Sequence, residues 1–263
     1  MKLSESTWAL TGADGSIGRV LRRHLRDRVQ RLVVADLQAP ADPADNEVSL
    51  AFDVTDPASI TPVVAGVDGV IHLAAVPDEA PYEALLRVNA LGTHNLLEAM
   101  RTQGVRHLVY ASSNRATGFH PVDAMLDDQS TIRPDGLYGA SKAAVEALTR
   151  LYADKFGLRV CNLRIGSFKA APVVPRDAAT WLSPGDMTRA FEAAMTAEQP
   201  FSVFYGVSAN RHRFWSLEPG HAVGYTPLDD ASDILGADVQ PSPHAPQAGA
   251  EFSSQEFTLR SMR

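Results

Sequence analysis

Two residues of this sequence have the types and the spacing of a proton-transfer pair. Tyr138 and Lys142 are four residues apart, which places the phenol and the ammonium on one face of a predicted helix. Because a nearby positive charge favours the ionised form of a phenol, the pKa of Tyr138, ordinarily ~10, is expected to fall toward neutrality. Such a tyrosine can exchange a proton with a substrate hydroxyl. The pair therefore predicts acid–base chemistry at a hydroxyl group.

A second group of residues, near the N-terminus, suits a phosphate-containing ligand. Gly12, Gly15 and Gly18 form a G-x-x-G-x-x-G motif between the first apolar run and the first predicted helix. Small residues are needed there because the turn takes unusual backbone angles, a pyrophosphate approaches main-chain N–H groups, and the helix packs close to the strand. Ser16 and Ile17, inside the motif, are expected to contact the same ligand. A tight structural turn is the alternative, but the position after a strand favours dinucleotide binding.

The identity of the dinucleotide is indicated by Asp36, which ends the second apolar run. A carboxylate at that place accepts hydrogen bonds from both adenosine ribose hydroxyls and repels a 2′-phosphate. No basic residue follows at Leu37 or Gln38, so NAD is predicted rather than NADP, with a solvated loop acid as the alternative interpretation of Asp36. Further cofactor contacts are expected after the third and fourth predicted strands, from Asp53, Val54, Leu73, Ala74 and Ala75.

Apolar runs of strand length alternate with helix-length amphipathic stretches as far as residue 167. The runs are nearly continuous, which is typical of parallel strands with both faces covered. This order predicts an α/β fold, a Rossmann-type doubly wound parallel sheet with a small C-terminal substrate-binding appendage. The expected strands are 7–10, 31–36, 48–52, 70–74, 108–111, 158–163 and 201–205. The expected helices are 20–28, 59–65, 82–103, 138–156 and 186–197.

The chain is expected to form a single domain. Residues 1–167 make mainly the NAD-binding core, and residues 168–263 supply mainly substrate-binding loops, helices and a C-terminal arm. Residues 241–250 contain three prolines and no apolar periodicity, which predicts an extended or mobile arm. Only 125 residues follow Tyr138 (263 − 138), and many of them complete the sheet. Little remains for a subdomain that grips a nucleotide-diphosphate sugar, so a small free substrate is favoured.

The composition argues against several other classes of protein. The chain has 24 Lys and Arg against 31 Asp and Glu, and its net charge of −7 disfavours a nucleic-acid partner. A single cysteine, Cys161, excludes an internal disulfide, and no Cys or His spacing fits a metal site. No apolar run approaches the ~18 residues of a membrane span. We expect a soluble cytoplasmic protein without a metal, a nucleic-acid partner or a membrane partner.

The glycine motif, a serine at the end of the fifth predicted strand and the Y-x-x-x-K pair together resemble the extended short-chain dehydrogenase/reductase family, in its NAD-dependent epimerase/dehydratase branch. The resemblance covers nearly the whole chain. It implies that Tyr138 is the catalytic acid/base, and that Lys142 binds the nicotinamide ribose and lowers the pKa of the tyrosine. It also implies that Ser113 holds the reacting hydroxyl and that Asn89 lies beneath the nicotinamide. Members of this family form dimers or larger homo-oligomers, commonly through the helices that begin near Tyr82 and Tyr138.

A narrower resemblance is to the uronate dehydrogenases within that family, which use NAD to oxidise C1 of cyclic D-galacturonate or D-glucuronate to an aldarolactone. It rests on the segments S-S-N at 112–114, R-P-D-G-L-Y-G at 133–139, R-I-G-S at 164–167, T-W-L-S at 180–183 and G-V-S-A-N at 206–210. The substrate contacts implied are Ser113, Asn114, Arg115, Tyr138, Ser167, Arg176 and Phe257. The pattern differs at two positions, because Arg115 replaces a histidine and Pro77 replaces a serine. These departures leave the identity of the sugar open.

Two other functions remain compatible with these residues. One is an extended short-chain enzyme that acts on a neutral aldose or another sugar derivative, as a dehydrogenase, an epimerase or a reductase. The other is a regulator that senses NAD without turnover, since a fold alone never fixes a function. Arg176 discriminates between the sugars, because a carboxylate substrate needs a cationic partner and a neutral one does not. The presence of Tyr138, Lys142 and Ser113 together favours an enzyme over a sensor.

Overall fold

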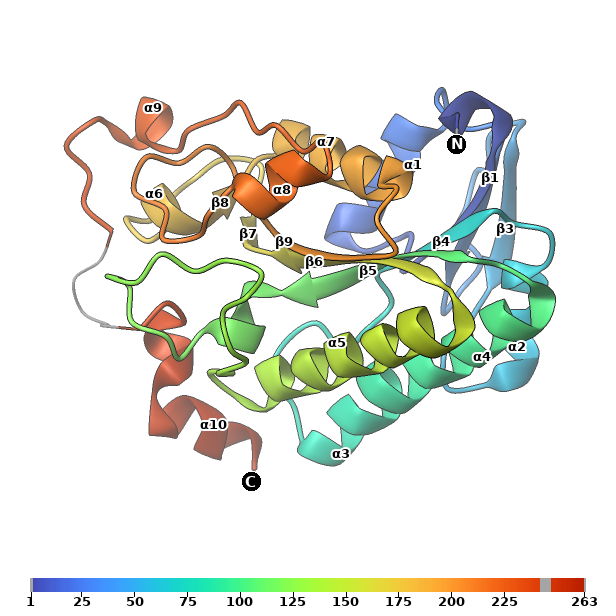
Figure 1. The fold of residues 1–263 in the computed structure, drawn as a ribbon, viewed down its shortest axis with the longest axis horizontal. Coiled ribbons are helices and arrows are strands. Elements are labelled where there is room, and N and C mark those ends of the chain that lie inside the picture. Colours follow the sequence, from blue (N-terminus) through green and yellow to red (C-terminus); the bar gives the residue numbers. More distant parts are fainter. Residues whose placement is uncertain (1, 242–246, 263) are drawn as a thin grey trace.

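A seven-stranded sheet forms the centre of the molecule, in the order β3-β2-β1-β4-β5-β6-β9 (Figure 1). The structure is a computed structural model and describes residues 2–241 and 247–262. The strands are β1 (Thr7–Thr11), β2 (Arg31–Asp36), β3 (Glu47–Ala51), β4 (Gly69–His72), β5 (His107–Ser113), β6 (Arg159–Ile165) and β9 (Phe201–Gly206). Every neighbouring pair is parallel, so all the carboxyl ends lie along one edge. The predicted doubly wound parallel sheet is confirmed.

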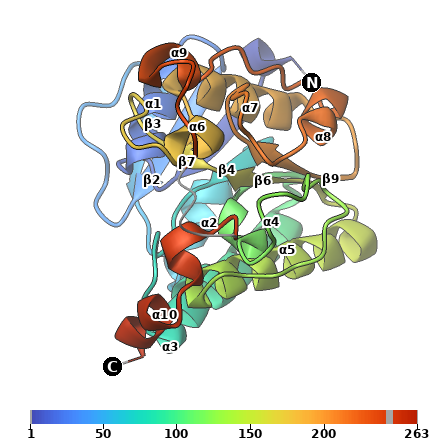
Figure 2. The same cartoon turned by 90° about the vertical axis from the view of Figure 1, so that its left-hand side faces the viewer.

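Helices cover both faces of this sheet, and Figure 2 shows the two layers from a second direction. One layer contains α1 (Ser16–Leu25) and α7 (Pro184–Thr196), and the opposite layer contains α2 (Pro57–Val64), α4 (Thr93–Gln103) and α5 (Leu137–Phe156). Each layer buries its own apolar cluster against the sheet, around Trp8 and Phe191 on one side and around Leu96 and Tyr152 on the other. Burial on both faces explains why the strands read as continuous apolar runs.

The largest departures from the predicted helix bounds have local reasons. α1 begins at Ser16 rather than at residue 20, because its first turn faces a cleft and contains a single large apolar residue, Ile17. The predicted helix 82–103 is observed as α3 (Tyr82–Leu85), a π-helical segment (Leu86–Gly92) and α4. In the described residues, no helix combines the length and the apolar character that crossing a bilayer requires.

The C-terminal third builds a smaller layer that the sequence predicts only in part. A two-stranded parallel sheet pairs β7 (Ser167–Phe168) with β8 (Trp181–Leu182). The same part of the chain contains short helices: α6 (Asp177–Thr180), α8 (Glu218–Ala222), α9 (Ser232–Leu235), a 3-10 turn (Ala250–Ser253) and α10 (Gln255–Ser261). Of the predicted arm at 241–250, residues 242–246 lie outside the described residues. The next part is paired with the body of the protein, because Gln247 forms a β-bridge with Pro121.

Candidate active site

A cleft of about 950 Å3 opens at the carboxyl edge of the sheet, where the strand order reverses between β1 and β4. Open α/β sheets bind their ligands at such a switch point. The volume is at the upper end of the ~300–1,000 Å3 typical of ligand pockets, which suits a dinucleotide with a small substrate. The predicted site residues that line it are Gly12, Gly15, Ser16, Ile17, Gly18, Asp36, Asp53, Val54, Leu73, Ala74, Ala75, Ser113, Asn114, Arg115, Tyr138, Lys142, Ser167 and Arg176.

The glycine motif forms a cradle that side chains would fill. Gly12 has a φ of +69°, and a Cβ there would lie 2.8 Å from the backbone nitrogen of Ala74. A Cβ on Gly18 would lie 2.2 Å from the carbonyl oxygen of Gly12. No side chain caps α1 at Gly15, so the N–H groups of its first turn can bind a pyrophosphate. These residues fit NAD, with the phosphates at the start of α1.

Asp36 lies at the adenosine end of this cradle, where a ribose is expected. One carboxylate oxygen of Asp36 accepts a hydrogen bond from the N–H of Asp14 at 2.9 Å, and the other accepts one from the N–H of Leu37 at 2.8 Å. These two bonds fix the carboxylate beside the glycine turn. A negative charge held there disfavours a 2′-phosphate.

We expect Asp36→Ala to narrow the preference for NAD over NADP. The wild-type enzyme should use NAD by a large margin, because the carboxylate repels the 2′-phosphate. The ratio of kcat/KM for the two cofactors measures this preference in both proteins. A wild-type enzyme that is equally fast with NADP would contradict the role given to Asp36.

Tyr138 and Ser113 converge from two different elements. Tyr138 lies in the first turn of α5, and Ser113 is the last residue of β5. Burial raises the pKa of Tyr138 to about 12, while the Arg115 guanidinium and a hydrogen bond from Ser113 oppose this rise. The predicted fall toward neutrality is therefore wrong for this structure. Desolvation of the phenolate, which a sequence does not reveal, outweighs the nearby charges.

Lys142 lies one turn further along α5 and is also buried. Its Nζ donates a hydrogen bond to the carbonyl oxygen of Ala111 at 2.8 Å and lies 5.7 Å from the centroid of the Tyr138 ring. Burial lowers the pKa of Lys142 to about 7, and the charge of Glu146 opposes that change only in part. The ammonium therefore points toward β5 rather than toward the phenol of Tyr138, which limits its effect on the pKa of Tyr138.

This burial predicts a pH dependence of stability. In the folded protein Lys142 releases its proton near a pKa of about 7, whereas the unfolded chain holds it up to the ordinary pKa of 10.5. Between these pH values the unfolded state binds more protons than the folded state. The contribution of Lys142 to the free energy of unfolding therefore rises with pH, by up to about 1.4 kcal/mol per pH unit. Urea unfolding at pH 7, 8 and 9 should show a steeper rise for the wild type than for Lys142→Met. Parallel curves would contradict the assignment.

Asn89 and Phe257 lie behind the cleft rather than on its wall. Asn89 is buried, and its side chain bonds both backbone groups of Val76 and the hydroxyl of Ser141. It therefore ties the loop after β4 to α5. Phe257 packs edge-on against Phe252 with ring centroids 4.9 Å apart, and Phe252 is the residue that lines the cleft. The contacts of Asn89 and Phe257 with ligands stay predictions.

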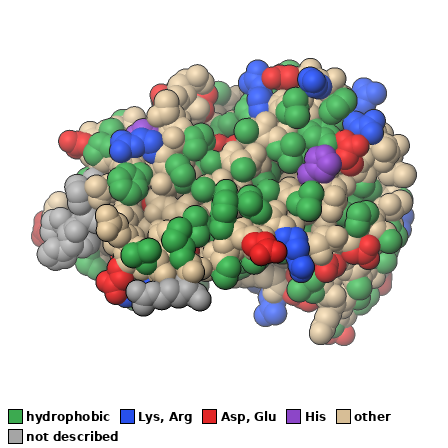
Figure 3. All heavy atoms as spheres, turned by 90° about the horizontal axis from the view of Figure 1, so that it is seen from below, with side chains coloured by type: hydrophobic (Ala, Val, Ile, Leu, Met, Phe, Trp, Pro, Cys, Tyr) green, Lys and Arg blue, Asp and Glu red, His purple; other side chains and the backbone are tan. Residues whose placement is uncertain are grey.

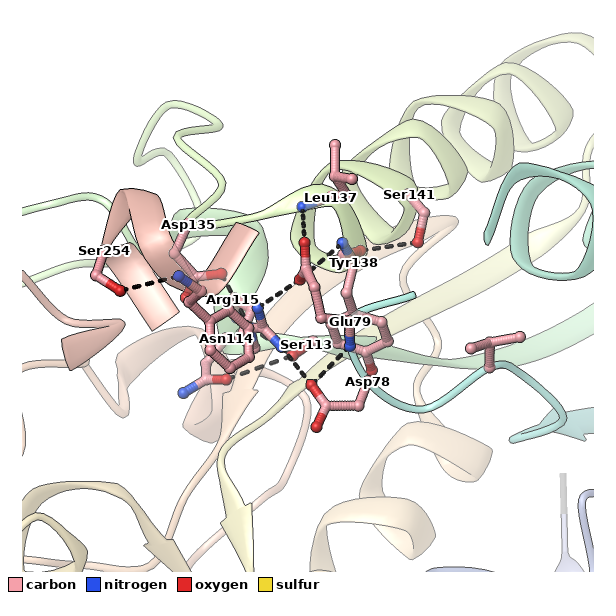
Figure 4. A network of polar contacts seen from close by, with 12 residues as sticks. Asp78, Glu79, Ser113, Asn114, Arg115, Asp135, Leu137, Tyr138, Ser141 and Ser254 are labelled. Carbon is pink, nitrogen blue, oxygen red and sulfur yellow. Dashed lines mark hydrogen bonds and ion pairs between the residues drawn. The ribbon is translucent and has the colours of Figure 1, made fainter. Parts of the chain in front are cut away.

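Arg115 is held by three carboxylates that sequence reasoning missed (Figure 4). Its Nε pairs with Asp135 at 2.9 Å, Nη1 with Asp78 at 2.8 Å and Nη2 with Glu79 at 2.8 Å. The guanidinium also lies 4.4 Å from the centroid of the Phe252 ring. These partners are 20 to 37 residues away in the chain, so no local spacing could reveal them. The contact of Arg115 with substrate stays a prediction.

Arg176 has a different environment from Arg115. Its two Nη atoms donate to the Ser167 hydroxyl at 3.3 Å and to the carbonyl of Ala248 at 3.1 Å. Both acceptors are neutral, and the carboxylates of Asp135 and Asp177 pair with Arg115 and Lys169 instead. Burial lowers the pKa of Arg176, and the charges of Glu251, Asp135 and Asp177 oppose this change only in part. The cleft thus contains a guanidinium that can bind a carboxylate.

The sequence profile of the NAD dependent epimerase/dehydratase family matches residues 8–199. The chain belongs to this family, as its motifs predict.

Individual relatives narrow the comparison. A uronate dehydrogenase of Pseudomonas syringae pv. tomato is 37% identical over 239 residues, 89% of this chain and 86% of that protein. A uronate dehydrogenase of Agrobacterium fabrum is 39% identical over 251 residues, 94% of this chain and 95% of that protein. A solved structure of a uronate dehydrogenase variant from Agrobacterium tumefaciens, complexed with NAD, has a TM-score of 0.88 at 35% identity and covers 96% of this chain and 98% of its own. The narrower resemblance to uronate dehydrogenases is therefore confirmed.

Proposed function

We propose that this protein is an NAD-dependent dehydrogenase that oxidises C1 of a cyclic hexuronate, D-galacturonate or D-glucuronate, to the aldarolactone. The observation that carries the proposal is Arg176, a guanidinium on the cleft wall with only neutral acceptors. It lies in the same cleft as Tyr138 and Ser113. A sugar with a carboxylate at C6 and a reactive hydroxyl at C1 complements the two ends of this arrangement.

The substrate is oriented by its two ends. The C1 hydroxyl lies at Tyr138 and Ser113, and the C6 carboxylate points toward Arg176, whose planar fork can make two parallel hydrogen bonds. Asn114 and Ser167 also line the cleft and are assigned to the ring hydroxyls. A pyranose held in this way keeps its ring closed during oxidation, so the product is a 1,5-lactone.

The chemistry requires a hydride to leave C1 and a proton to leave the hydroxyl oxygen on C1. NAD, held by the glycine motif and Asp36, would supply the acceptor for the hydride of C1. Tyr138, as the phenolate, removes the proton of the C1 hydroxyl as the C1–H bond breaks, and the C1–O bond becomes a carbonyl. Ser113 donates a hydrogen bond that holds the reacting oxygen, and Lys142 holds the nicotinamide ribose. Burial raises the pKa of Tyr138 and so disfavours the phenolate, whereas the Arg115 guanidinium and the hydrogen bond from Ser113 favour it.

The alternatives are less favoured. A neutral aldose leaves the Arg176 guanidinium without an anionic partner, which buried charges require. A sensor without turnover gives no reason for a tyrosine, a serine and a lysine at one end of the cleft.

We expect Tyr138→Phe to lower kcat by at least roughly a hundredfold while NAD still binds, because the base is lost and the ring remains. Turnover with galacturonate and NAD titration by fluorescence measure the two effects. Tyr152→Phe, on the same helix and bonded to Glu98 away from the cleft, is the matched control and should keep its activity. Activity retained in Tyr138→Phe would disprove the assignment.

We expect Arg176→Ala to lower kcat/KM for a uronate by about 10- to 150-fold, because a charge-assisted hydrogen bond contributes about 1.5–3 kcal/mol. Any activity on galactose or glucose should barely change. Arg211→Ala, which removes an exposed loop arginine paired with Asp230, is the control. Equal losses on both kinds of sugar would make Arg176 structural. A wild-type preference for the neutral sugar would support an aldose dehydrogenase instead.

Association of the chain with itself is a further part of the proposal. Apolar side chains gather among charged ones on the lower face of the molecule, which carries α5 (Figure 3). On this side Leu91 and Leu151 are 56% and 43% exposed, and Ala144 and Ala147 are exposed on the face of α5 that includes Leu151. A second copy that covers this surface would form the expected homo-oligomer, which sedimentation velocity measures. The cytoplasmic location stays a prediction.

A further inference from the structure

We propose that Glu79 is a positioning residue for Tyr138. Its carboxylate, from the loop after β4, caps the first turn of α5, and Arg115 holds that carboxylate in place (Figure 4). The inference rests on the proposed role of Tyr138 as the acid/base. It assigns to the loop after β4 a part in the reaction in addition to lining the cleft.

The cap is made by both carboxylate oxygens of Glu79. Oε1 accepts a hydrogen bond from the N–H of Leu137 at 2.6 Å, and Oε2 accepts one from the N–H of Tyr138 at 3.3 Å. Oε2 also accepts from Nη2 of Arg115 at 2.8 Å. The Glu79 side chain is only 4% exposed, so these bonds are shielded from water. The first N–H groups of a helix have no partner within it, and an anion there also meets the positive end of the helix dipole.

No side chain at the N-cap position caps α5, and the residue there leaves space for the carboxylate of Glu79. The N-cap residue of α5 is Gly136, which offers no side chain. A Cβ at Gly136 would lie 2.6 Å from one oxygen of Glu79 and 3.0 Å from Nη2 of Arg115. Gly136 has an extended backbone that any residue can adopt, so the reason for glycine here is space for the carboxylate.

Arg115 connects the cap to the phenol. Its guanidinium pairs with Glu79 on one side and with Asp135, just before α5, on another. The same guanidinium lies 5.2 Å from the centroid of the Tyr138 ring. Loss of the cap would therefore loosen the backbone of Tyr138 and the cation against its ring together. A displacement of about 1 Å can cost roughly a hundredfold in rate, which is why a residue without any reacting atom can matter.

Two substitutions at Glu79 separate capping from charge. Glu79→Ala removes both, and we expect kcat to fall about 10- to 100-fold while KM for NAD changes less than about twofold. Glu79→Gln keeps an oxygen that can accept from Leu137, and it should restore at least a third of the lost activity on a logarithmic scale. Glu83→Ala is the matched control, because Glu83 is an exposed carboxylate on the nearby α3. Rates are expressed per NAD-binding site, which corrects for misfolded protein.

Each outcome of these measurements supports or overturns the inference. A lower kcat with unchanged NAD affinity and a partial recovery in Glu79→Gln supports it. Wild-type kcat in Glu79→Ala overturns it. Equal losses in Glu79→Ala and Glu79→Gln overturn the capping role, and a joint loss of kcat and NAD affinity shows a general structural role instead.

The double variant links the effect to Tyr138. In a Tyr138→Phe background, Glu79→Ala should cause no further loss of kcat, because the group that Glu79 positions is already absent. Independent, multiplicative losses would mean that Glu79 acts elsewhere. Full activity of Tyr138→Phe alone would reject the proposed function itself, whereas an inactive Tyr138→Phe with a normal Glu79→Ala would reject only this inference.

Discussion

The attachment of α5 to β5 is the constraint on which the site depends. The two elements supply Tyr138 and Ser113, so their separation sets the distance between the proposed base and the hydroxyl proposed to hold the substrate. Lys142 fixes this separation through its bond to the Ala111 carbonyl, and one turn further Glu146 accepts from the Ser112 hydroxyl at 2.5 Å. The bonds are buried, and breaking one would leave a charge or a polar group without a partner. The helix therefore has little freedom to slide along the strand.

Much of the fold could be predicted because it is recorded in local patterns. Parallel strands covered on both faces are continuous apolar runs, and Gly157, with a φ of +69°, ends α5 as its position predicts. The pair β7 and β8 could not be predicted, since two-residue strands carry no periodicity. The same holds for α10, whose seven residues show no buried face, because every side chain in it is at least partly exposed. Local patterning fails where an element is too short to repeat its period several times or buries no face.

The features of the site also fall into those that local sequence patterns predict and those that they do not. Residues that line the cleft from the ends of strands were predicted, because the carboxyl edge of a parallel sheet gathers them wherever they occur in the chain. Glu79 was missed, since its partner Leu137 is 58 residues away and nothing near either residue marks the contact. The pKa of Tyr138 was predicted in the wrong direction for a related reason. Spacing reveals a neighbouring charge, but burial, the larger effect here, depends on the whole fold.

The two arginines of the cleft show how position changes the use of one residue type. Arg115 is surrounded by three carboxylates, so this end of the cleft carries more negative than positive charge. Arg176 bonds only a hydroxyl and a carbonyl, and Phe252 lies within 5.5 Å of both guanidinium groups. A uronate that entered with its carboxylate toward Arg115 would meet Asp78, of which 68% of the side chain is exposed. The carboxylate of Asp78 disfavours this entry, which agrees with the proposed orientation in which C1 faces Tyr138.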